Sequence, residues 1–379
     1  MIDAILLGTG GTRPLPARAL ASLVLRYEGV TLLFDCGEGS QVNFMRSGLS
    51  IFDLDYIFIT HLHADHVLGF AGIVATLSNL QRVKPLQIFG PPGVKRLLLG
   101  ALEGLFGSPL HLPFLISFFE YGSNDVILNF GQFQIRAFRV DHTVPCYGYA
   151  FEEIRPNRFS REIATACIPS EYWGIFQQGY QVDVNGKTYL QEQLFGPKRA
   201  GLKIVYATDT RPTAELVKYS LGANLLVLEG MHPTVNSGCS ILNSKHMAVS
   251  EAIEIASVCD ADRLWLTHFS PGFHPKSSDI KTAQKVFPQT VFGRDGMTLS
   301  LEHTDITAHV MVNATQFDQL WQGESIAVLS NDLSIDSDAR VHVVTDEGAQ
   351  QRVCGVGYRS MPVEIVQHRF KKLIVRRTV

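Results

Sequence analysis

The segment "YIFITHLHADHVLGF", residues 56–70, constrains this chain most strongly. After an apolar run, three histidines and one aspartate fall within six positions. His61 and His63, two positions apart on extended backbone, can point to the same side, and Asp65 and His66 follow at the predicted start of a helix. Imidazole and carboxylate groups are metal ligands, and four of them buried without a metal would each need another partner. The segment therefore predicts a metal site at the end of a buried strand.

The ligand count at this site favours two adjacent ions. Four ligands on one short loop are more than a single catalytic ion with an open position needs. Three further candidates follow predicted strands: His142, Asp209 and His268. Taken alone, each is more typical of a hydrogen-bonded loop histidine or a turn-forming aspartate. Two-metal sites suit phosphoester hydrolysis because they stabilise both the attacking and the leaving oxygen.

Composition limits the classes of protein to consider. No apolar run approaches the length of a membrane span, so no membrane association is expected. The six cysteines show no paired spacing, which favours reduced thiols and a cytoplasmic location. The formal net charge is −3, so nucleic-acid binding would require a local basic patch.

The chain divides into three predicted parts. Strand and helix patterns alternate over residues 1–306 and predict an α/β domain in which helices cover the sheets. Residues 152–200 interrupt it with glycine, proline, aromatic and basic residues without periodicity, which predicts an arm-like insertion. From 307 to 379, six short strand-like runs separated by turn residues predict a small all-β accessory module.

Five segments occur in an order that resembles a known family: "FDCGEGSQ", "ITHLHADHVLGFAG", "FGP", "GPKRAGLKIVYATDTRP" and "LTHFS". The chain is similar to the ribonuclease Z branch of the metallo-β-lactamase superfamily, whose members are tRNA 3′-processing endonucleases. The resemblance covers roughly residues 1–303. It implies an αββα sandwich with the metal site at the strand ends between the two sheets.

The resemblance also implies a ligand set and an activity. By this resemblance, one ion would be held by His61, His63 and His142, and the other by Asp65, His66 and His268. Asp209 would bridge the two ions. The implied cofactors are two Zn²⁺, with Mn²⁺ or Fe²⁺ also suited to such ligands. A metal-bridged hydroxide would cleave a phosphodiester and leave a 3′-hydroxyl on the tRNA.

The implied catalytic groups are Asp65, Glu229 and His246. His246 would be oriented by Glu229 and would donate a proton to the departing 3′-oxygen. The simpler alternative is that His246 caps its helix and Glu229 pairs with a surface lysine.

The implied partners are precursor tRNA and a second copy of the chain in a homodimer. The arm weakens the tRNA expectation, because "IPSEYWGIFQQG" lacks basic residues and carries Glu171, whereas phosphate binding needs lysine or arginine. The main alternative is a small-molecule or cyclic phosphodiesterase of the same fold with no tRNA substrate. A different hydrolase, such as a lactonase, and a non-catalytic RNA-binding protein also stay open.

Overall fold

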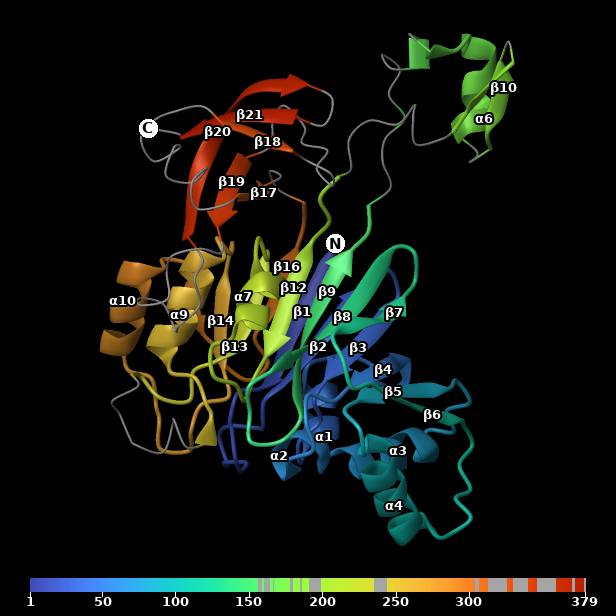
Figure 1. Cartoon of the computed structure of the whole chain (residues 1–379). Coiled ribbons are helices and arrows are strands. Elements are labelled where there is room, and N and C mark those ends of the chain that lie inside the picture. The colour runs from blue at the N-terminus through green and yellow to red at the C-terminus, as the bar shows by residue number, and fades with distance from the viewer. Residues whose placement is uncertain are drawn as a thin grey trace. The chain divides into compact units, whose positions relative to one another are not determined.

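The structure is a computed structural model of the whole chain (Figure 1). It leaves undescribed residues 156–158, 160–163, 166, 178–179, 185, 191–198, 235–243, 304–306, 313–325, 330–339, 346–358, 370–371 and 378–379, and beyond residue 303 it describes only the backbone of the strands. The chain forms two compact units, one of Met1–Glu152, Leu202–His303 and Thr345–Ser360, the other of Glu153–Gly201, Thr304–Val344 and Met361–Val379. No helix in the described part is long and apolar enough to cross a membrane.

Two seven-stranded sheets form the framework of the first unit. The first sheet has the strand order β16 (Thr298–Leu301), β1 (Ile2–Gly8), β2 (Ser22–Tyr27), β3 (Val30–Phe34), β4 (Leu54–Phe58), β5 (Leu86–Gly90) and β6 (Ile116–Glu120). The second has the order β15 (Thr290–Phe292), β14 (Leu264–Thr267), β13 (Leu225–Glu229), β12 (Lys203–Ala207), β9 (Cys146–Glu153), β8 (Phe133–Val140) and β7 (Asp125–Asn129). Strands β3 to β6 run parallel, as do β12 to β15.

Side-chain alternation along the strands creates three apolar layers. In β1, Ile2, Ala4 and Leu6 enter the core shared by the two sheets, whereas Ile5 and Leu7 enter a core on the opposite face. Successive side chains of a strand point to opposite faces, so a strand that is apolar throughout must be covered on both sides.

The second sheet follows the same rule. In β13, Leu225 and Val227 join the core between the sheets, and Leu226 and Leu228 join a third core on the far side. The three cores require helices on both outer faces. The predicted αββα sandwich is confirmed.

The helices supply this cover. Those packed on the first sheet are α1 (Ser40–Arg46), α2 (Ala64–Val67), α3 (Phe70–Asn79) and α4 (Val94–Phe106), and those packed on the second are α7 (Ala214–Ser220), α9 (Val249–Val258) and α10 (Ser277–Val286) (Figure 1). The sequence pattern over residues 66–80 predicts one helix, but the structure divides it at Gly69. The Gly69 amide donates to the carbonyl of Cys36 (2.8 Å), and a Cβ there would lie 2.0 Å from the Gly37 oxygen.

The remaining elements are small. The hairpin of β10 (Val182–Val184) and β11 (Lys187–Tyr189) lies near α6 (Trp173–Gln177) in sequence, and Ile168, Val182 and Val184 form a minor apolar cluster. A separate five-stranded sheet has the order β17 (Thr307–Val312), β19 (Arg340–Thr345), β20 (Arg359–Arg369), β21 (Lys372–Arg377) and β18 (Ile326–Leu329). Five of the six predicted strand-like runs correspond to these strands, and most of the sixth, 352–359, lies outside the described residues. The domain boundaries at 152–200 and 306/307 stay a prediction.

Candidate metal centre

Parallel strands bring polar residues from distant parts of the chain to one edge. Asp35 follows β3, and the segment from His61 to His66, which enters α2, follows the parallel neighbour strand β4. In the second sheet, Asp209 follows β12 and His268 follows β14, with β13 between them. In parallel sheets the carboxyl ends of the strands lie together, which is where ligand sites form.

The two remaining candidates reach the same edge by other routes. His142 lies in the loop between β8 and β9, and β9 pairs antiparallel with β12, so the start of β9 lies beside the end of β12. Glu229 is the last residue of β13. The sandwich thus gathers at one place the candidates that the sequence spreads from position 61 to position 268.

Three of the residues that line this edge have left-handed backbone conformations. Asp35, Asp209 and His268 have φ angles of 58°, 54° and 51°. Non-glycine residues adopt such angles at a cost and do so mainly at functional sites. Each of them lies within two residues of the end of its strand, β3, β12 or β14.

The first group of candidate ligand atoms comprises His61, His63, His142 and Asp209, one atom from each, all within 4.8 Å of one another. His63 Nδ1 lies 3.0 Å from His61 Nε2 and 3.3 Å from His142 Nε2. Asp209 Oδ1 lies 3.9 Å from both His61 Nε2 and His142 Nε2. These separations bracket the ~3.3 Å expected between ligand atoms around a tetrahedral ion with bonds of about 2.0–2.1 Å.

The second group comprises Asp65, His66 and His268. Asp65 Oδ2 lies 3.5 Å from the Nε2 atoms of both histidines. Asp209 Oδ2 lies 3.2 Å from His66 Nε2 and 3.1 Å from His268 Nε2. Asp209 therefore presents one carboxylate oxygen to each group, as a bridging ligand would.

Buried atoms without hydrogen-bond partners test whether metal ions fit here. Within the described part of the chain, such atoms include Asp209 Oδ2, His66 Nε2 and His268 Nε2. Leaving buried polar atoms unpaired is costly, and several of them converging on one point indicates a missing ligand. The donor set of imidazole nitrogens and carboxylate oxygens suits divalent transition metals. The residues present fit the implied ions.

The protonation states of the ion-free site also fit metal binding. Burial lowers the pKa of His61 well below 6.5, which leaves the neutral imidazole that a metal requires. Burial would also lower the pKa of His268, but the nearby carboxylates of Asp209 and Asp65, 3.1 and 3.5 Å from its Nε2, outweigh burial and raise the pKa to about 10. Burial would raise the pKa of Asp209, but His268 and His66 hold it well below 3.8. Without metal, protonated histidines balance these carboxylates.

Asp35 forms hydrogen bonds to a candidate ligand and to the residues around it. Asp35 was not identified as a site residue from the sequence. Its carboxylate accepts hydrogen bonds from His66 Nδ1 (2.8 Å), from the amide (2.8 Å) and hydroxyl of Thr60, and from the Tyr206 hydroxyl (3.1 Å). A bond from Nδ1–H fixes the tautomer of His66 and leaves Nε2 free to bind metal. The signal was present, because Asp35 lies in "FDCGEGSQ" directly after a strand.

Glu229 and His246 form a hydrogen-bonded pair at the rim of the second group. His246 Nδ1 lies 2.9 Å from Glu229 Oε2, and Glu229 is fully buried. Burial would lower the pKa of His246, but Glu229 outweighs it and the net pKa lies above 6.5. A histidine that retains its proton beside a metal centre can act as a general acid. Helix capping does not describe His246, which lies before the Ala248 cap of α9.

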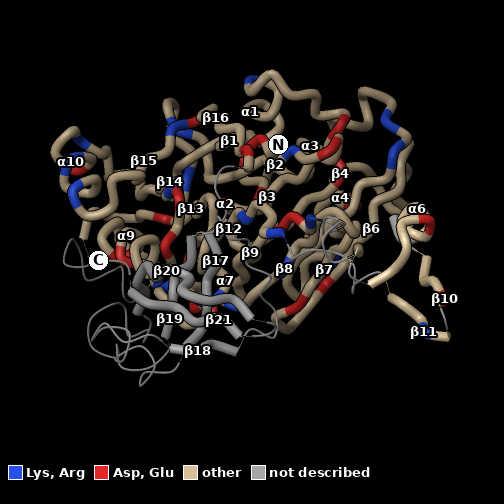
Figure 2. Tube along the Cα trace, turned by 90° about the horizontal axis from the view of Figure 1, so that it is seen from above, with Lys and Arg blue, Asp and Glu red and all other residues tan. Residues whose placement is uncertain are grey.

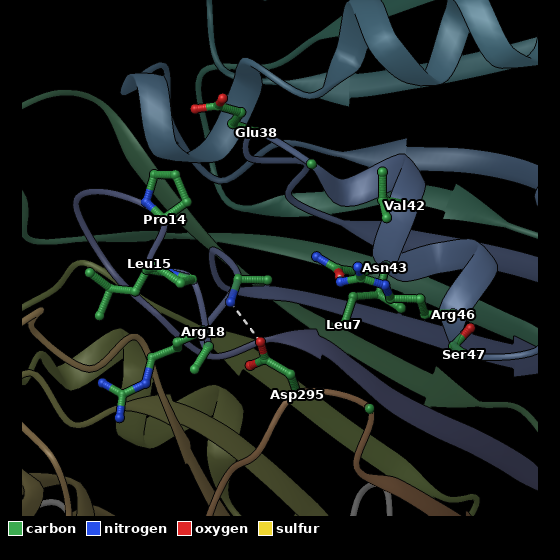
Figure 3. Close-up of a pocket in the computed structure, with 15 residues that line it drawn as sticks. Leu7, Pro14, Leu15, Arg18, Glu38, Val42, Asn43, Arg46, Ser47 and Asp295 are labelled. Atoms are coloured by element: carbon green, nitrogen blue, oxygen red, sulfur yellow. Dashed lines mark hydrogen bonds between the residues drawn. The ribbon is translucent and has the colours of Figure 1, made fainter.

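A glycine-rich loop borders the centre. The Thr12 amide donates to Asp65 Oδ2 (2.7 Å), and a Cβ on Gly11 would lie 2.6 Å from the His268 ring. The continuation of this loop, residues 14–19, forms one wall of a pocket of about 570 Å³, and α1 forms the facing wall (Figure 3). Arg18, Arg46 and Glu38 line it, and Asp295 closes it by accepting the Ala19 amide (2.6 Å).

Comparison with known proteins agrees with this geometry. A family model described as "Anti-Pycsar protein Apyc1" matches residues 2–158. The chain is 35% identical to ribonuclease Z of Lachnoclostridium phytofermentans over 303 residues, which cover 80% of this chain and 98% of that one. It is 37% identical to ribonuclease Z of Agathobacter rectalis over 302 residues, 79% and 98% of the two chains.

Solved structures give the same class. Human tRNase Z, short form, superposes with a TM-score of 0.58 and 25% identity over 79% of this chain and 100% of that one. The metallo-β-lactamase fold protein YhfI of Bacillus subtilis gives 0.55 with 18% identity over 79% and 98%, which speaks for the fold alone. Fold and site thus define a metallo-β-lactamase-fold metalloprotein.

Within that class, the extent of the match to the curated relatives decides the family. The chain belongs to the ribonuclease Z family. About a fifth of this chain has no counterpart in these two relatives, which are themselves matched over 98% of their length.

Proposed function

We propose that this protein is a dinuclear metal-dependent endonuclease that cleaves 3′-extended precursor tRNA and leaves a 3′-hydroxyl on the tRNA. The observation that carries the proposal is the meeting of two groups of buried ligand atoms at Asp209, in a chain that spans 98% of curated ribonuclease Z relatives. Two adjacent metal sites are the arrangement that phosphodiester cleavage uses.

The proposed cofactors are two Zn²⁺ ions, and Mn²⁺ or Fe²⁺ would also suit the donor set. The proposed ligands lie on the two sides of Asp209: His61, His63 and His142 on the side of its Oδ1, and Asp65, His66 and His268 on the side of its Oδ2. When bound, the two ions would acidify a water molecule and neutralise charge on the phosphate.

The protein's own groups would move the protons. Asp65, whose side chain is 13% exposed, lies at the open side of the centre and is assigned to accept the proton of the attacking water. The water oxygen bonds to phosphorus as the bond from phosphorus to the 3′-oxygen breaks. The 3′-oxygen leaves with the bonding electrons and takes a proton from His246, and Glu229 stabilises the charged imidazole until that transfer.

The substrate must be held by local contacts, because basic and acidic residues are intermixed over the described part of the chain (Figure 2) and the net charge is −3. In the arm, Glu171 is exposed and the Arg155 guanidinium donates to the main-chain oxygen of Ala200 (3.2 Å), whereas Arg158 and Arg161 lie outside the described residues. We therefore propose that the arm contributes little to tRNA affinity.

A second candidate is a phosphodiesterase for small or cyclic phosphoesters. Two observations favour it: the acidic Glu171 in the arm, and the match of residues 2–158 to a family model other than ribonuclease Z. The same metal centre would serve it. The two candidates differ in whether RNA is cut.

The assembly and location are also proposals. A homodimer is supported by exposed apolar side chains on α4, namely Leu97, Leu105 and Phe106, which self-association would cover. A cytoplasmic location is supported by the free thiols of Cys36, Cys146 and Cys259.

The test is cleavage of a 3′-extended precursor tRNA by the full chain, with the cut mapped at nucleotide resolution and cyclic AMP assayed in parallel. We expect a single cut after the discriminator nucleotide that produces a 3′-hydroxyl. Intact precursor together with turnover of the cyclic nucleotide would contradict the proposal and establish the second candidate.

A further inference from the structure

Arg211 connects the loop that carries Asp209 to the segment that carries His246. Its guanidinium Nη1 donates to the main-chain oxygen of His246 (2.6 Å) and to Glu251 Oε2 (2.9 Å), and its Nη2 donates to Glu251 Oε1. Its own amide donates to the carbonyl of Asp141 (3.0 Å). One side chain thus holds the backbone of His246 against the first turn of α9.

Glu251 completes this connection. Its Oε2 also accepts the amide of Ala248 (2.9 Å), two residues after His246, and the residue is 7% exposed. The Arg211 side chain is 19% exposed, so the pair is largely removed from water. Planar, two-pronged pairing between arginine and carboxylate fixes geometry as well as charge.

The His246 side chain is fixed separately, by Glu229. Glu229 in turn accepts the Thr210 amide through Oε1 (2.6 Å), directly before Arg211 in the chain. The imidazole is therefore aimed by one carboxylate, and its backbone is placed by Arg211 and Glu251. Neither Arg211 nor Glu251 belongs to the groups of candidate metal ligands.

We propose that Arg211 and Glu251 are positioning residues for His246, and that they assist departure of the leaving group without taking part in metal binding or in the attack on phosphorus. This inference rests on the proposed function, in which His246 gives its proton to the oxygen that leaves as the phosphorus–oxygen bond breaks. A general acid displaced by a fraction of an ångström protonates that oxygen poorly.

Leaving-group chemistry separates this role from a merely structural one. A ribose oxygen is a poor leaving group and needs the proton, whereas p-nitrophenolate departs without it. Damage to the fold or to the metal centre would slow both substrates. Damage to the placement of His246 would slow only the substrate with the poor leaving group.

The experiment compares Glu251→Gln and Arg211→Lys with wild type on 3′-extended precursor tRNA and on bis(p-nitrophenyl) phosphate. On the precursor, we expect kcat to fall about 30- to 100-fold in Glu251→Gln with KM nearly unchanged, because misplacement of a catalytic group costs up to about 10²-fold. Arg211→Lys keeps the positive charge but cannot donate to both His246 and Glu251, so its kcat on the precursor should lie between those of wild type and Glu251→Gln. On the aryl ester, all three proteins should agree, with equal metal content.

Glu152→Gln is the matched control. Glu152 accepts a hydrogen bond from Gln134 (2.6 Å) and lies 3.7 Å from Arg136, so its loss breaks a similar pair away from His246. It should behave as wild type on both substrates. Equal losses on both substrates in Glu251→Gln, or no loss on the precursor, would overturn the inference.

The outcome for wild type distinguishes the two proposals. If wild type leaves precursor tRNA intact, the proposed function fails, and cyclic AMP, which also has a ribose oxygen as leaving group, replaces the RNA in the same comparison. A selective loss there would still support the positioning role. A wild type that cleaves neither would contradict both.

Discussion

The two sheets supply the metal centre in different ways. The first sheet contributes His61, His63, Asp65 and His66 from one short segment that follows β4 and enters α2, so their relative positions are set by six consecutive residues. The second sheet contributes single side chains from separate strand ends, two of them, Asp209 and His268, with left-handed backbones. One half depends on local chain geometry, and the other on how strands pack.

Asp209 joins the two halves, and its removal should have the largest effect. We expect Asp209→Ala to lose both ions and to reduce hydrolysis of any phosphodiester on the order of 10³-fold or more, because charge stabilisation disappears at both ions. His63→Ala, which removes a ligand from one group only, should retain close to one ion. Metal analysis after desalting measures this, and an Asp209→Ala protein that keeps both ions would refute the bridging assignment.

The first half should depend on Asp35. In Asp35→Asn, one amide oxygen must replace a carboxylate that accepts from His66, Thr60 and Tyr206. Zinc affinity, measured against a competing chelator, should fall about 10- to 100-fold. Asp55→Asn is the control, since Asp55 is buried and accepts the Thr31 amide (3.0 Å) away from the centre. Equal affinity in the two variants would show that the loop after β4 needs no such support.

The pH should sharpen the same comparison. The pKa of His268 is raised to about 10 in the ion-free protein, whereas burial holds that of His61 below 6.5. Below pH 10, an ion that binds the second group must displace the His268 proton, so its apparent affinity should rise about tenfold per pH unit for each proton released. Zinc titrations at pH 6.5 and 7.5 measure this dependence. An apparent zinc affinity that is the same at both pH values would contradict the charge pairing described for Asp209 and His268.

The arm should show the smallest effect. Glu171→Lys replaces an exposed negative charge by a positive one, and should lower KM for precursor tRNA by about two- to fivefold at low salt, because each phosphate contact adds a salt-dependent increment. Glu171→Gln separates loss of repulsion from new attraction. The aryl ester should not respond. An unchanged KM would indicate that this part of the arm does not approach the RNA.

The sequence predicted the two halves unequally, for physical reasons. The spacing of His61, His63 and His66 predicts a metal site by itself, because this many buried polar groups would otherwise each need a separate hydrogen-bond partner. His142, Asp209 and His268 are candidates because each follows a predicted strand, but a lone residue of this kind is an ordinary loop residue until the topology of β8, β9, β12 and β14 brings the three together. The family resemblance assigned them as ligands. Spacing gives no sign of such non-local contacts.

The supporting residues show the same limit. Asp35 meets His66 only because β3 and β4 are parallel neighbours, and Arg211 meets Glu251 across forty positions. The single helix predicted over residues 66–80 is divided because Gly69 bonds to Cys36, a contact that helical spacing cannot reveal. The division of the chain at 152–200 and at 306/307 stays a prediction.

The most direct test of the account is reconstitution of the metal-stripped protein with increasing zinc while cleavage of precursor tRNA is followed. The account predicts that activity requires about two equivalents of zinc per chain, since Asp209 faces two separate groups of ligands. Full activity at one equivalent, or cleavage that persists in the stripped protein, would contradict a dinuclear centre.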